Sequence, residues 1–515
     1  MLGRWIWSLT SSVALPAVLG MPCLAEEAPS GHAVVKIDCA KTRGELSPYV
    51  FGSMAGPGFD DRAATLLKDA GFKLVEVNVP FPPRPAREGP AKFDLADLDR
   101  AVELIRKIGA EPLPILSPDR KPQDLDRFAE YVRAVAAHLQ EKFGKTGGVR
   151  VWRFSNEPDL DVFWHGTRLE WCETYAAWAR ALKEVDAQFL VGGFSFCAAL
   201  REIKPGRGPG DPPPDPPTTL GPFAREALDS CRDNGVPVDW FSFHAYGPVT
   251  YDDFHLQAKV VAGELAKYPK LSPIFGTPRL ANDEWNIKVG DAWSGEYDPV
   301  FDSVTVAAHN ILSLIEMVEQ GLWLSIRYGG TTNAPAKESG MPERPGKIRG
   351  DLSNGHDFPL TDGKGQGKPG WFAFKGFNLL STAPVLLETE GGDHVNLGVC
   401  AGKSADVKTV VVVLSNYDVE GAVRDMLGPK PIKKMQRRMV ARALEGTGAK
   451  AVTRYGKFSI AVEGLGDKGR WERLAVDSRR KLEAVESGSW SGGRVALEGA
   501  MECPSVQVWV LRGEE

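Results

Sequence analysis

The chain has 515 residues, of which 43% are hydrophobic and 25% are charged, as in a globular protein with a large and a smaller domain. Its 62 basic and 67 acidic residues leave a net charge of −5, which provides no basic surface for nucleic acid. Nucleic-acid partners are therefore excluded from the expected functions. The 14 tryptophans suit a core, and indole faces also stack on sugar rings.

The first residues, 1–25, have the pattern of a secretory signal peptide. Arg4 supplies the positive start, residues 5–19 are mostly apolar, and Ala25 offers a small residue for cleavage. A membrane anchor is the weaker interpretation, because the stretch is short and contains Pro16 and Pro22. We therefore expect a secreted or periplasmic protein with no membrane span in the mature chain.

From residue 49 onward, strand and helix patterns alternate, which predicts a parallel sheet with crossover helices. The expected strands are 49–52, 74–79, 111–116, 149–154, 189–196, 238–243, 279–283 and 322–328. The expected helices are 61–70, 95–108, one through 128–143, 170–185, 222–234, 253–267, 303–319 and 371–380. Eight such units over about 330 residues predict an α/β fold, a (β/α)8 TIM barrel.

Three long segments follow the second, fifth and eighth expected strands, at residues 80–93, 204–219 and 329–370. All lie on the side where barrel strands end, which carries the active site in this fold. They either line a substrate cleft or form surface loops.

After residue 381 the helical period ends. Short strands are expected at 409–415, 437–444, 458–462, 474–477 and 506–511, and together they predict a C-terminal antiparallel β-sandwich. An early strand at 33–38 precedes the barrel and is a candidate to join that sandwich. The predicted domains are a signal peptide at 1–25, a catalytic barrel at 26–383 and a β-sandwich at 384–515.

Two glutamates each end a short apolar run, Glu157 at the fourth expected strand and Glu284 at the seventh. Three units apart in a closed barrel of eight strands, they should face each other across its mouth. Such a pair, one carboxyl donating a proton and the other attacking carbon, is what a retaining glycoside hydrolase requires. A carboxyl separation of about 5 Å indicates retention and about 6.5–9.5 Å inversion, a distance that only a structure provides.

The segments around these glutamates resemble those of a known family. Phe154-Ser155-Asn156-Glu157-Pro158, Phe243-His244-Ala245-Tyr246-Gly247 and Asp283-Glu284-Trp285-Asn286 resemble glycoside hydrolase family 39, the β-xylosidase and α-L-iduronidase family. This family belongs to a clan of (β/α)8 retaining glycosidases, and the resemblance covers most of the chain. The family tends to place basic or imidazole residues at the end of strand two, where this chain has Glu76-Val77-Asn78-Val79-Pro80.

The resemblance implies a role for each of six residues. Glu157 would be the general acid/base and Glu284 the nucleophile, which Tyr246 would keep ionised by donating a hydrogen bond to it. Substrate contacts would come from Asn156, His244, Tyr246 and Trp285, with Asn156 on the sugar 2-hydroxyl.

Other interpretations stay open. The glutamates could form structural ion pairs, Asn156 could cap a turn, His244 could be a core histidine, and Tyr246 and Trp285 could be packing residues. A catalytically silent carbohydrate-binding protein and a transglycosylase would use the same fold.

No cofactor and no metal site are expected. The cysteines are scattered without a CxxC pair or a histidine at metal spacing, and the glycine-rich segment 363–368 follows no strand. The expected function is a retaining glycoside hydrolase that cleaves O-glycosidic bonds of a poly- or oligosaccharide.

Overall fold

The computed structural model describes residues 31–55, 59–80, 94–144, 149–202, 217–287, 299–330, 360–362, 365–426, 432–449 and 451–514. The expected signal peptide at 1–25 lies outside these residues, as does most of each expected segment at 80–93, 204–219 and 329–370. Within the described part of the chain, no helix has both the length and the apolar character needed to span a membrane.

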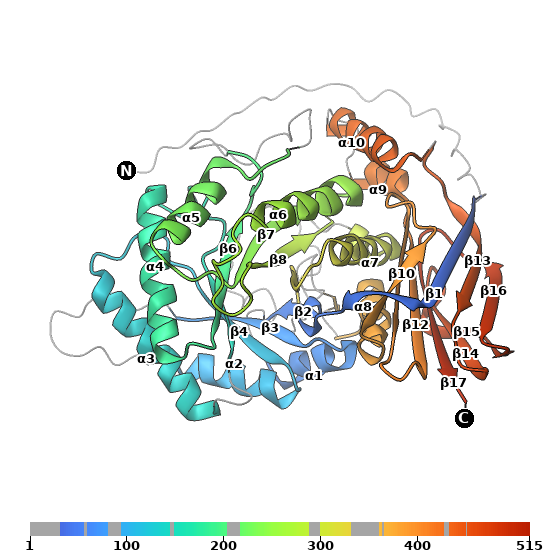
Figure 1. Ribbon diagram of the computed structural model, residues 1–515, viewed down its shortest axis with the longest axis horizontal. Coiled ribbons are helices and arrows are strands. Elements are labelled where there is room, and N and C mark those ends of the chain that lie inside the picture. Colours follow the sequence, from blue (N-terminus) through green and yellow to red (C-terminus); the bar gives the residue numbers. More distant parts are fainter. Residues whose placement is uncertain are drawn as a thin grey trace, which may run out of the picture.

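Eight parallel strands close into a barrel, as predicted (Figure 1). In chain order they are β2 (Gly52–Met54), β3 (Leu74–Asn78), β4 (Glu111–Leu116), β5 (Val151–Phe154), β6 (Leu190–Phe196), β7 (Trp240–Tyr246), β8 (Arg279–Asn286) and β9 (Leu324–Arg327). The strand expected at 49–52 begins later, because a 3-10 turn at Pro48–Val50 precedes β2. An apolar layer near the strand starts, with Leu74, Leu113, Val151, Leu190 and Trp240 among its members, fills one end of the barrel. The polar side chains at the strand ends therefore lie at the opposite end of the barrel, its mouth.

Helices cover the barrel from outside, close to their expected positions. They are α1 (Asp61–Ala70), α2 (Ala96–Lys107), α3 (Leu125–Phe143), α4 (Arg168–Val185), α5 (Pro222–Asp233), α6 (Gln257–Leu265), α7 (Val304–Glu319) and α8 (Pro369–Phe377). Local signals fix their ends. The Asp60 side chain accepts from the Ala63 N–H at the start of α1, and Gly71 ends that helix with a left-handed φ of 84°.

Nine strands form a second, mostly antiparallel sheet beside the barrel. They are β1 (Gly31–Glu45), β10 (Val385–Glu390), β11 (Leu397–Lys403), β12 (Thr409–Asn416), β13 (Tyr455–Glu463), β14 (Lys468–Val476), β15 (Lys481–Ser491), β16 (Arg494–Ala500) and β17 (Ser505–Gly513). Their order is β15-β14-β17-β12-β11-β10-β1-β13-β16. The strand expected at 33–38 is thus part of β1, which lies between β10 and β13 and shows as blue among orange and red strands (Figure 1).

Both faces of the central strand β12 are buried. Val410, Val412 and Leu414 face a core shared with β1, β13 and β16, so the sheet folds over its own apolar interior as a sandwich. Val411 and Val413, which alternate with them, join the core that continues into the barrel helices. The sandwich is therefore fixed to the barrel through an apolar interface, mainly along α7 and α8.

One predicted strand is wrong. Residues 437–444 lie in α10 (Ile432–Thr447), which follows α9 (Val419–Met426). Met439, Val440 and Ala443 are buried at helical spacing, whereas Arg442 donates through Nε to Asp252 Oδ2 at 2.8 Å. The eight-residue window looked like a short apolar strand because its helical period only becomes visible over the longer segment.

Candidate functional site

The backbone at the mouth of the barrel is irregular in three adjacent strand pairs. Register shifts interrupt the pairing of β6 with β7, of β7 with β8 and of β8 with β9. Ser155 and Glu157, just after β5, have φ values of 72° and 41°, which non-glycine residues rarely adopt. The Glu157 N–H donates to Ser195 O at 2.9 Å, and Ser195 itself has a φ of 50°. Such conformations persist only where surrounding contacts impose them, and they concentrate at functional sites.

The two predicted glutamates meet here, with a histidine between them. An oxygen of Glu157, an oxygen of Glu284 and a ring nitrogen of His244 all lie within 4.8 Å of one another. His244 Nδ1 is 2.9 Å from Glu157 Oε1 and 3.9 Å from Glu284 Oε1. Tyr246 donates its hydroxyl to the same Glu284 oxygen at 2.7 Å. The ends of the fourth, sixth and seventh strands of the barrel thus bring Glu157, His244, Tyr246 and Glu284 together.

A layer of buried charge supports this group from below. Arg153, which is fully buried, lies 2.8 Å through Nε from Asp283 Oδ2 and pairs through Nη1 with Glu76. Asp283 also accepts the Ser195 hydroxyl at 2.6 Å, and its other oxygen is 3.4 Å from His244 Nε2. The imidazole is therefore held between a carboxylate at each ring nitrogen, which fixes its orientation toward Glu157.

Asn156 is positioned by the same arginine. Arg153 Nη2 donates to Asn156 Oδ1 at 2.7 Å. The amide oxygen of Asn156 accepts this hydrogen bond, which leaves its NH2 group as the donor available to a ligand. Asn156 is half-buried beside Glu157, where such a donor could meet a sugar hydroxyl.

Burial and neighbouring charges shift the pKa values of this site in opposite directions. Burial opposes protonation of His244, but Glu284, Asp283 and Glu157 outweigh it and raise the pKa of His244 to about 10. Asp283 is also buried, yet Arg153 and His244 hold its pKa at about 2. Burial raises the pKa of Glu284, and Glu157 adds to that rise, against His244, Arg153 and Tyr246. The surrounding carboxylates thus favour the protonated form of the His244 imidazole.

This charge state affects the chemistry of the site. A protonated imidazole donates hydrogen bonds, and His244 Nδ1 faces Glu157 Oε1 at 2.9 Å. The arrangement suits acid–base and nucleophilic chemistry by the two glutamates.

Trp285 does not belong to this group. Its side chain is fully buried on the outer side of the barrel, with ring contacts to Phe254 and Phe374 and a 2.7 Å hydrogen bond from Nε1 to Ser325 Oγ. Neighbouring residues of a strand point to opposite faces, so the position after Glu284 faces the helices. The expected sugar contact from Trp285 is corrected to a packing role.

The sequence analysis missed the supporting residues Arg153, Asp283, Glu76 and Ser195. One signal was available for Arg153, since a lone charge in the apolar run 151–154 of a parallel strand has to find a buried partner. Its partners lie 77 and 130 residues away, at Glu76 and Asp283, and no local pattern connects them.

Comparison with known proteins gives the family and agrees with the fold. The model of glycosyl hydrolases family 39 matches residues 118–423. The β-xylosidase of Caldicellulosiruptor saccharolyticus is 26% identical over 360 residues, covering 64% of this chain and 65% of that protein. The β-xylosidase of Geobacillus stearothermophilus is 31% identical over 128 residues, covering 24% of this chain and 21% of that protein. The chain thus spans just under two thirds of the first of these relatives and a fifth of the second.

Solved structures match over nearly the whole chain. A glucosidase from Croceicoccus marinus superimposes with a TM-score of 0.68 at 20% identity, covering 94% of this chain and 100% of that one. A monomeric β-xylosidase from Caulobacter crescentus gives 0.64 at 17% identity, with the same coverage of 94% and 100%. At these identities the likeness concerns the fold, a barrel with its accompanying β-sandwich.

Proposed function

Because the chain belongs to glycosyl hydrolases family 39, we propose that it is a retaining glycoside hydrolase with Glu157 as acid/base and Glu284 as nucleophile. The observation that carries the proposal is the pair of carboxylates whose nearest oxygens lie within 4.8 Å. Retaining enzymes have carboxyl groups about 5–5.5 Å apart, whereas inverting enzymes leave about 6.5–9.5 Å for a water molecule. The pair fits the first class.

The first step forms a bond between Glu284 and the anomeric carbon. The bond from that carbon to the leaving oxygen breaks, and the leaving oxygen takes the proton of Glu157. Tyr246, donating to Glu284 Oε1 at 2.7 Å, keeps the attacking carboxylate ionised and oriented. The other oxygen of Glu284, Oε2, is then the one that attacks the anomeric carbon.

The second step releases the sugar. Esterified Glu284 is uncharged, and Glu157, now a carboxylate, takes a proton from water while the water oxygen attacks the anomeric carbon. The ester bond breaks and Glu284 leaves as a carboxylate, which restores the starting state. His244, at 2.9 Å from Glu157 Oε1, orients that group in both steps, and the Asn156 NH2 group would bind the sugar 2-hydroxyl.

We propose a β-xyloside as the first substrate to test, because both curated relatives are named β-xylosidases. The solved glucosidase makes a β-glucoside the second. The test is hydrolysis of aryl β-xylosides and β-glucosides by the wild type and by Glu284→Gln. Loss of turnover in a variant with unchanged melting is expected, because an amide cannot form the ester.

A 2-fluoro glycoside distinguishes the alternatives. Such a substrate should trap a covalent adduct on Glu284, located by mass spectrometry, and adduct on another residue would contradict the assignment. Binding of oligosaccharide without any turnover would identify a silent carbohydrate-binding protein instead. Products longer than the substrate would identify a transglycosylase with the same nucleophile.

We also propose that residues 1–25 direct the chain out of the cytoplasm, from the sequence pattern alone. Detection of mature protein in the secreted or periplasmic fraction with an N-terminus near Glu26 is expected. Full-length chain with Met1 intact in the cytosol would contradict it.

A further inference from the structure

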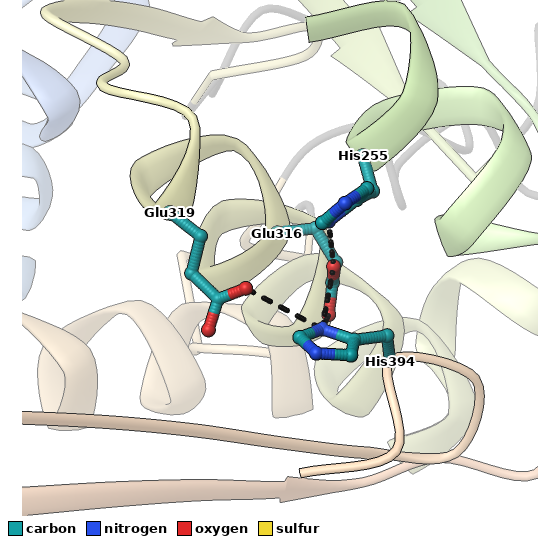
Figure 2. A group of neighbouring side chains, drawn as sticks. All are labelled: His255, Glu316, Glu319 and His394. Atoms are coloured by element: carbon teal, nitrogen blue, oxygen red, sulfur yellow. Dashed lines mark hydrogen bonds and ion pairs between the residues drawn. The ribbon is translucent and has the colours of Figure 1, made fainter. Parts of the chain in front are cut away.

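A second cluster of ionisable side chains lies outside the barrel, where α7 meets the β-sandwich (Figure 2). Glu316 and Glu319 project from α7, His255 from the π-helical turn Tyr251–Leu256 after β7, and His394 from the connection between β10 and β11. One donor atom from each residue lies within 4.8 Å of all the others. Since His255 and His394 are 61 and 78 residues from Glu316, no sequence spacing announced this group.

Three of the six separations between the four donor atoms are short enough to compare with a coordination sphere. His394 Nδ1 is 3.1 Å from Glu316 Oε2 and 3.4 Å from Glu319 Oε2, and His255 Nδ1 is 2.7 Å from Glu316 Oε2. Ligand atoms bound tetrahedrally at about 2.0–2.1 Å are themselves roughly 3.3 Å apart. Two of the three separations already match, and the shortest has to lengthen by about 0.6 Å on that geometry.

Burial makes the cluster costly without a cation. The Glu316 side chain is fully buried, and those of His255 and Glu319 are only 12% and 19% exposed. Two buried carboxylates demand positive charge. Without an ion, His394 supplies part of it, because its hydrogen bond to Glu316 raises the pKa of His394 to about 9. A divalent ion supplies two charges and takes the place of that proton. The charge of Arg43 also attracts the Glu319 carboxylate, but the Nη2 atom of Arg43 donates to the Cys400 sulfur at 3.8 Å. Two imidazoles with two carboxylates suit Zn²⁺ and its neighbours better than Mg²⁺ or Ca²⁺, which prefer all-oxygen sites.

The backbone holds one imidazole in place in advance. His394 has a φ of 59°, which is uncommon for a residue other than glycine. Here the preceding Asp393 imposes it, because Asp393 Oδ1 accepts the N–H groups of residues 395, 396 and 397 at 2.9, 2.7 and 2.7 Å. Its other oxygen accepts the Tyr455 hydroxyl at 2.9 Å, which ties the loop to β13.

The other imidazole is held by its own turn. His255 sits in a π-helical turn, a rare element that is frequent at functional sites. The ring of Tyr251 stacks on the imidazole, with centroids 5.0 Å apart and planes inclined by 14°. Both histidines are thus ordered before any ion arrives, which reduces the entropy lost on binding.

We propose that His255, Glu316, Glu319 and His394 form a structural binding site for a transition-metal dication, Zn²⁺ by its donor set, that joins the β-sandwich to the barrel. The site takes two ligands from α7, one from the turn after β7 and one from the sandwich. Metal binding there fastens the two domains to each other. The proposal is independent of the glycosidase reaction.

The first experiment measures metal directly. The full-length protein, stripped with a chelator and then dialysed against Zn²⁺, should retain one equivalent by elemental analysis. At a hundredfold excess of Zn²⁺ over Kd, Tm should rise by a few degrees for a chain of this size. No retained Zn²⁺ and an unchanged Tm would overturn the proposal and leave the cluster as an ion-pair network.

Variants locate the ion. His394→Asn removes the imidazole but keeps a residue that tolerates positive φ, and Glu319→Gln removes one carboxylate without changing its shape. Both should lose the Zn²⁺ and the rise in Tm. His138→Ala is the matched control, because this imidazole lies on the surface outside the cluster. Among the described contacts it pairs with Asp99 at 2.8 Å, so its loss should change neither readout. Full retention of Zn²⁺ in His394→Asn and Glu319→Gln would place it elsewhere, for example at Glu157, His244 and Glu284.

A spectroscopic readout covers the case in which a variant folds poorly. Co²⁺ bound to the wild type in place of Zn²⁺ should give the intense visible absorption of a four-coordinate ion. Glu319→Gln should weaken or shift that band, because a carboxylate is replaced by an amide. A weak, six-coordinate type of spectrum that is identical in wild type and variant would contradict the proposed ligands.

Discussion

Asp283→Asn tests the buried charge that supports the candidate active site. Asp283 is fully buried, with Oδ2 2.8 Å from Arg153 Nε and 2.6 Å from the Ser195 hydroxyl, and Oδ1 3.4 Å from His244 Nε2. Asparagine keeps the shape and one acceptor oxygen but removes the negative charge. The variant therefore isolates what the charge contributes.

The magnitude follows from the pKa of Asp283, which Arg153 and His244 hold at about 2 against burial, compared with an ordinary 3.8. At about 1.4 kcal/mol for each pKa unit, this difference corresponds to roughly 2–3 kcal/mol of stability at neutral pH. Breaking a buried ion pair costs about 3–5 kcal/mol when a partner is left unpaired, but Arg153 keeps Glu76. We expect a loss of about 2–3 kcal/mol in the free energy of unfolding.

The pH dependence of the free energy of unfolding tests whether the lowered pKa of Asp283 is the cause. A carboxyl whose pKa is lowered on folding stabilises the fold above its unfolded pKa of 3.8, and this contribution is lost as pH falls through about 2. The gap between wild type and Asp283→Asn should therefore stay constant from about pH 7 to pH 5 and narrow below about pH 4.

Urea denaturation followed by tryptophan fluorescence measures that gap. Asp233→Asn is the matched control, because this carboxyl is 63% exposed and pairs only with its neighbour Arg232 among the described contacts, so it should change stability by less than about 0.5 kcal/mol. If Asp283→Asn were as stable as the control at neutral pH, or if its deficit were unchanged near pH 3, the buried carboxylate would not carry the charge assigned to it.

Three further changes test the other roles. Glu157→Ala should slow glycosides with poor leaving groups far more than activated aryl glycosides, since the latter need no proton, and azide should restore the second step; equal losses on both substrates would exclude the acid role. Tyr246→Phe should lower kcat by about tenfold to a hundredfold and move the acidic limb of the pH profile upward, because the ionised form of Glu284 loses a donor at 2.7 Å; Tyr268→Phe, which removes a hydroxyl that donates to Asp229 at 3.0 Å after α6, is the control, and an unmoved limb would contradict the role. Truncation before Pro384 should give insoluble or easily melted protein, because it uncovers the apolar faces of α7 and α8 at about 25 cal/mol per Å²; a soluble barrel with unchanged melting would show that the sandwich is an independent module.

The sequence predicted what local patterns encode. Each barrel helix and strand was expected within a few residues, because apolar periodicity and caps such as Gly71 depend on near neighbours. The two glutamates and His244 were identified as candidates because they lie at the ends of the fourth, sixth and seventh strands, and parallel strands bring their ends to one rim.

Contacts over long separations could not be predicted in this way. Asp283 directly precedes Glu284 and would ordinarily face the opposite side of the strand, yet the register shift in β8 lets both reach the interior. Trp285 looked like a site residue beside the nucleophile, but it follows the strand period and packs outward. In α10, a short apolar window favoured a strand. The partner of Arg442 in the folded chain is the buried Asp252, which is 190 residues away and which the window could not reveal.

The position of β1 has a consequence for synthesis of the chain. Its parallel partner β13 begins with Tyr455 opposite Gly31, 424 residues later. At about 5–20 residues per second, the ribosome needs roughly 20–85 s to supply that partner. During this time the whole barrel emerges while β1 has unpaired edges, which are the usual starting points of aggregation. We expect a chaperone to be needed at this stage, and a circular permutant with β1 placed after β17 to refold faster than the natural order.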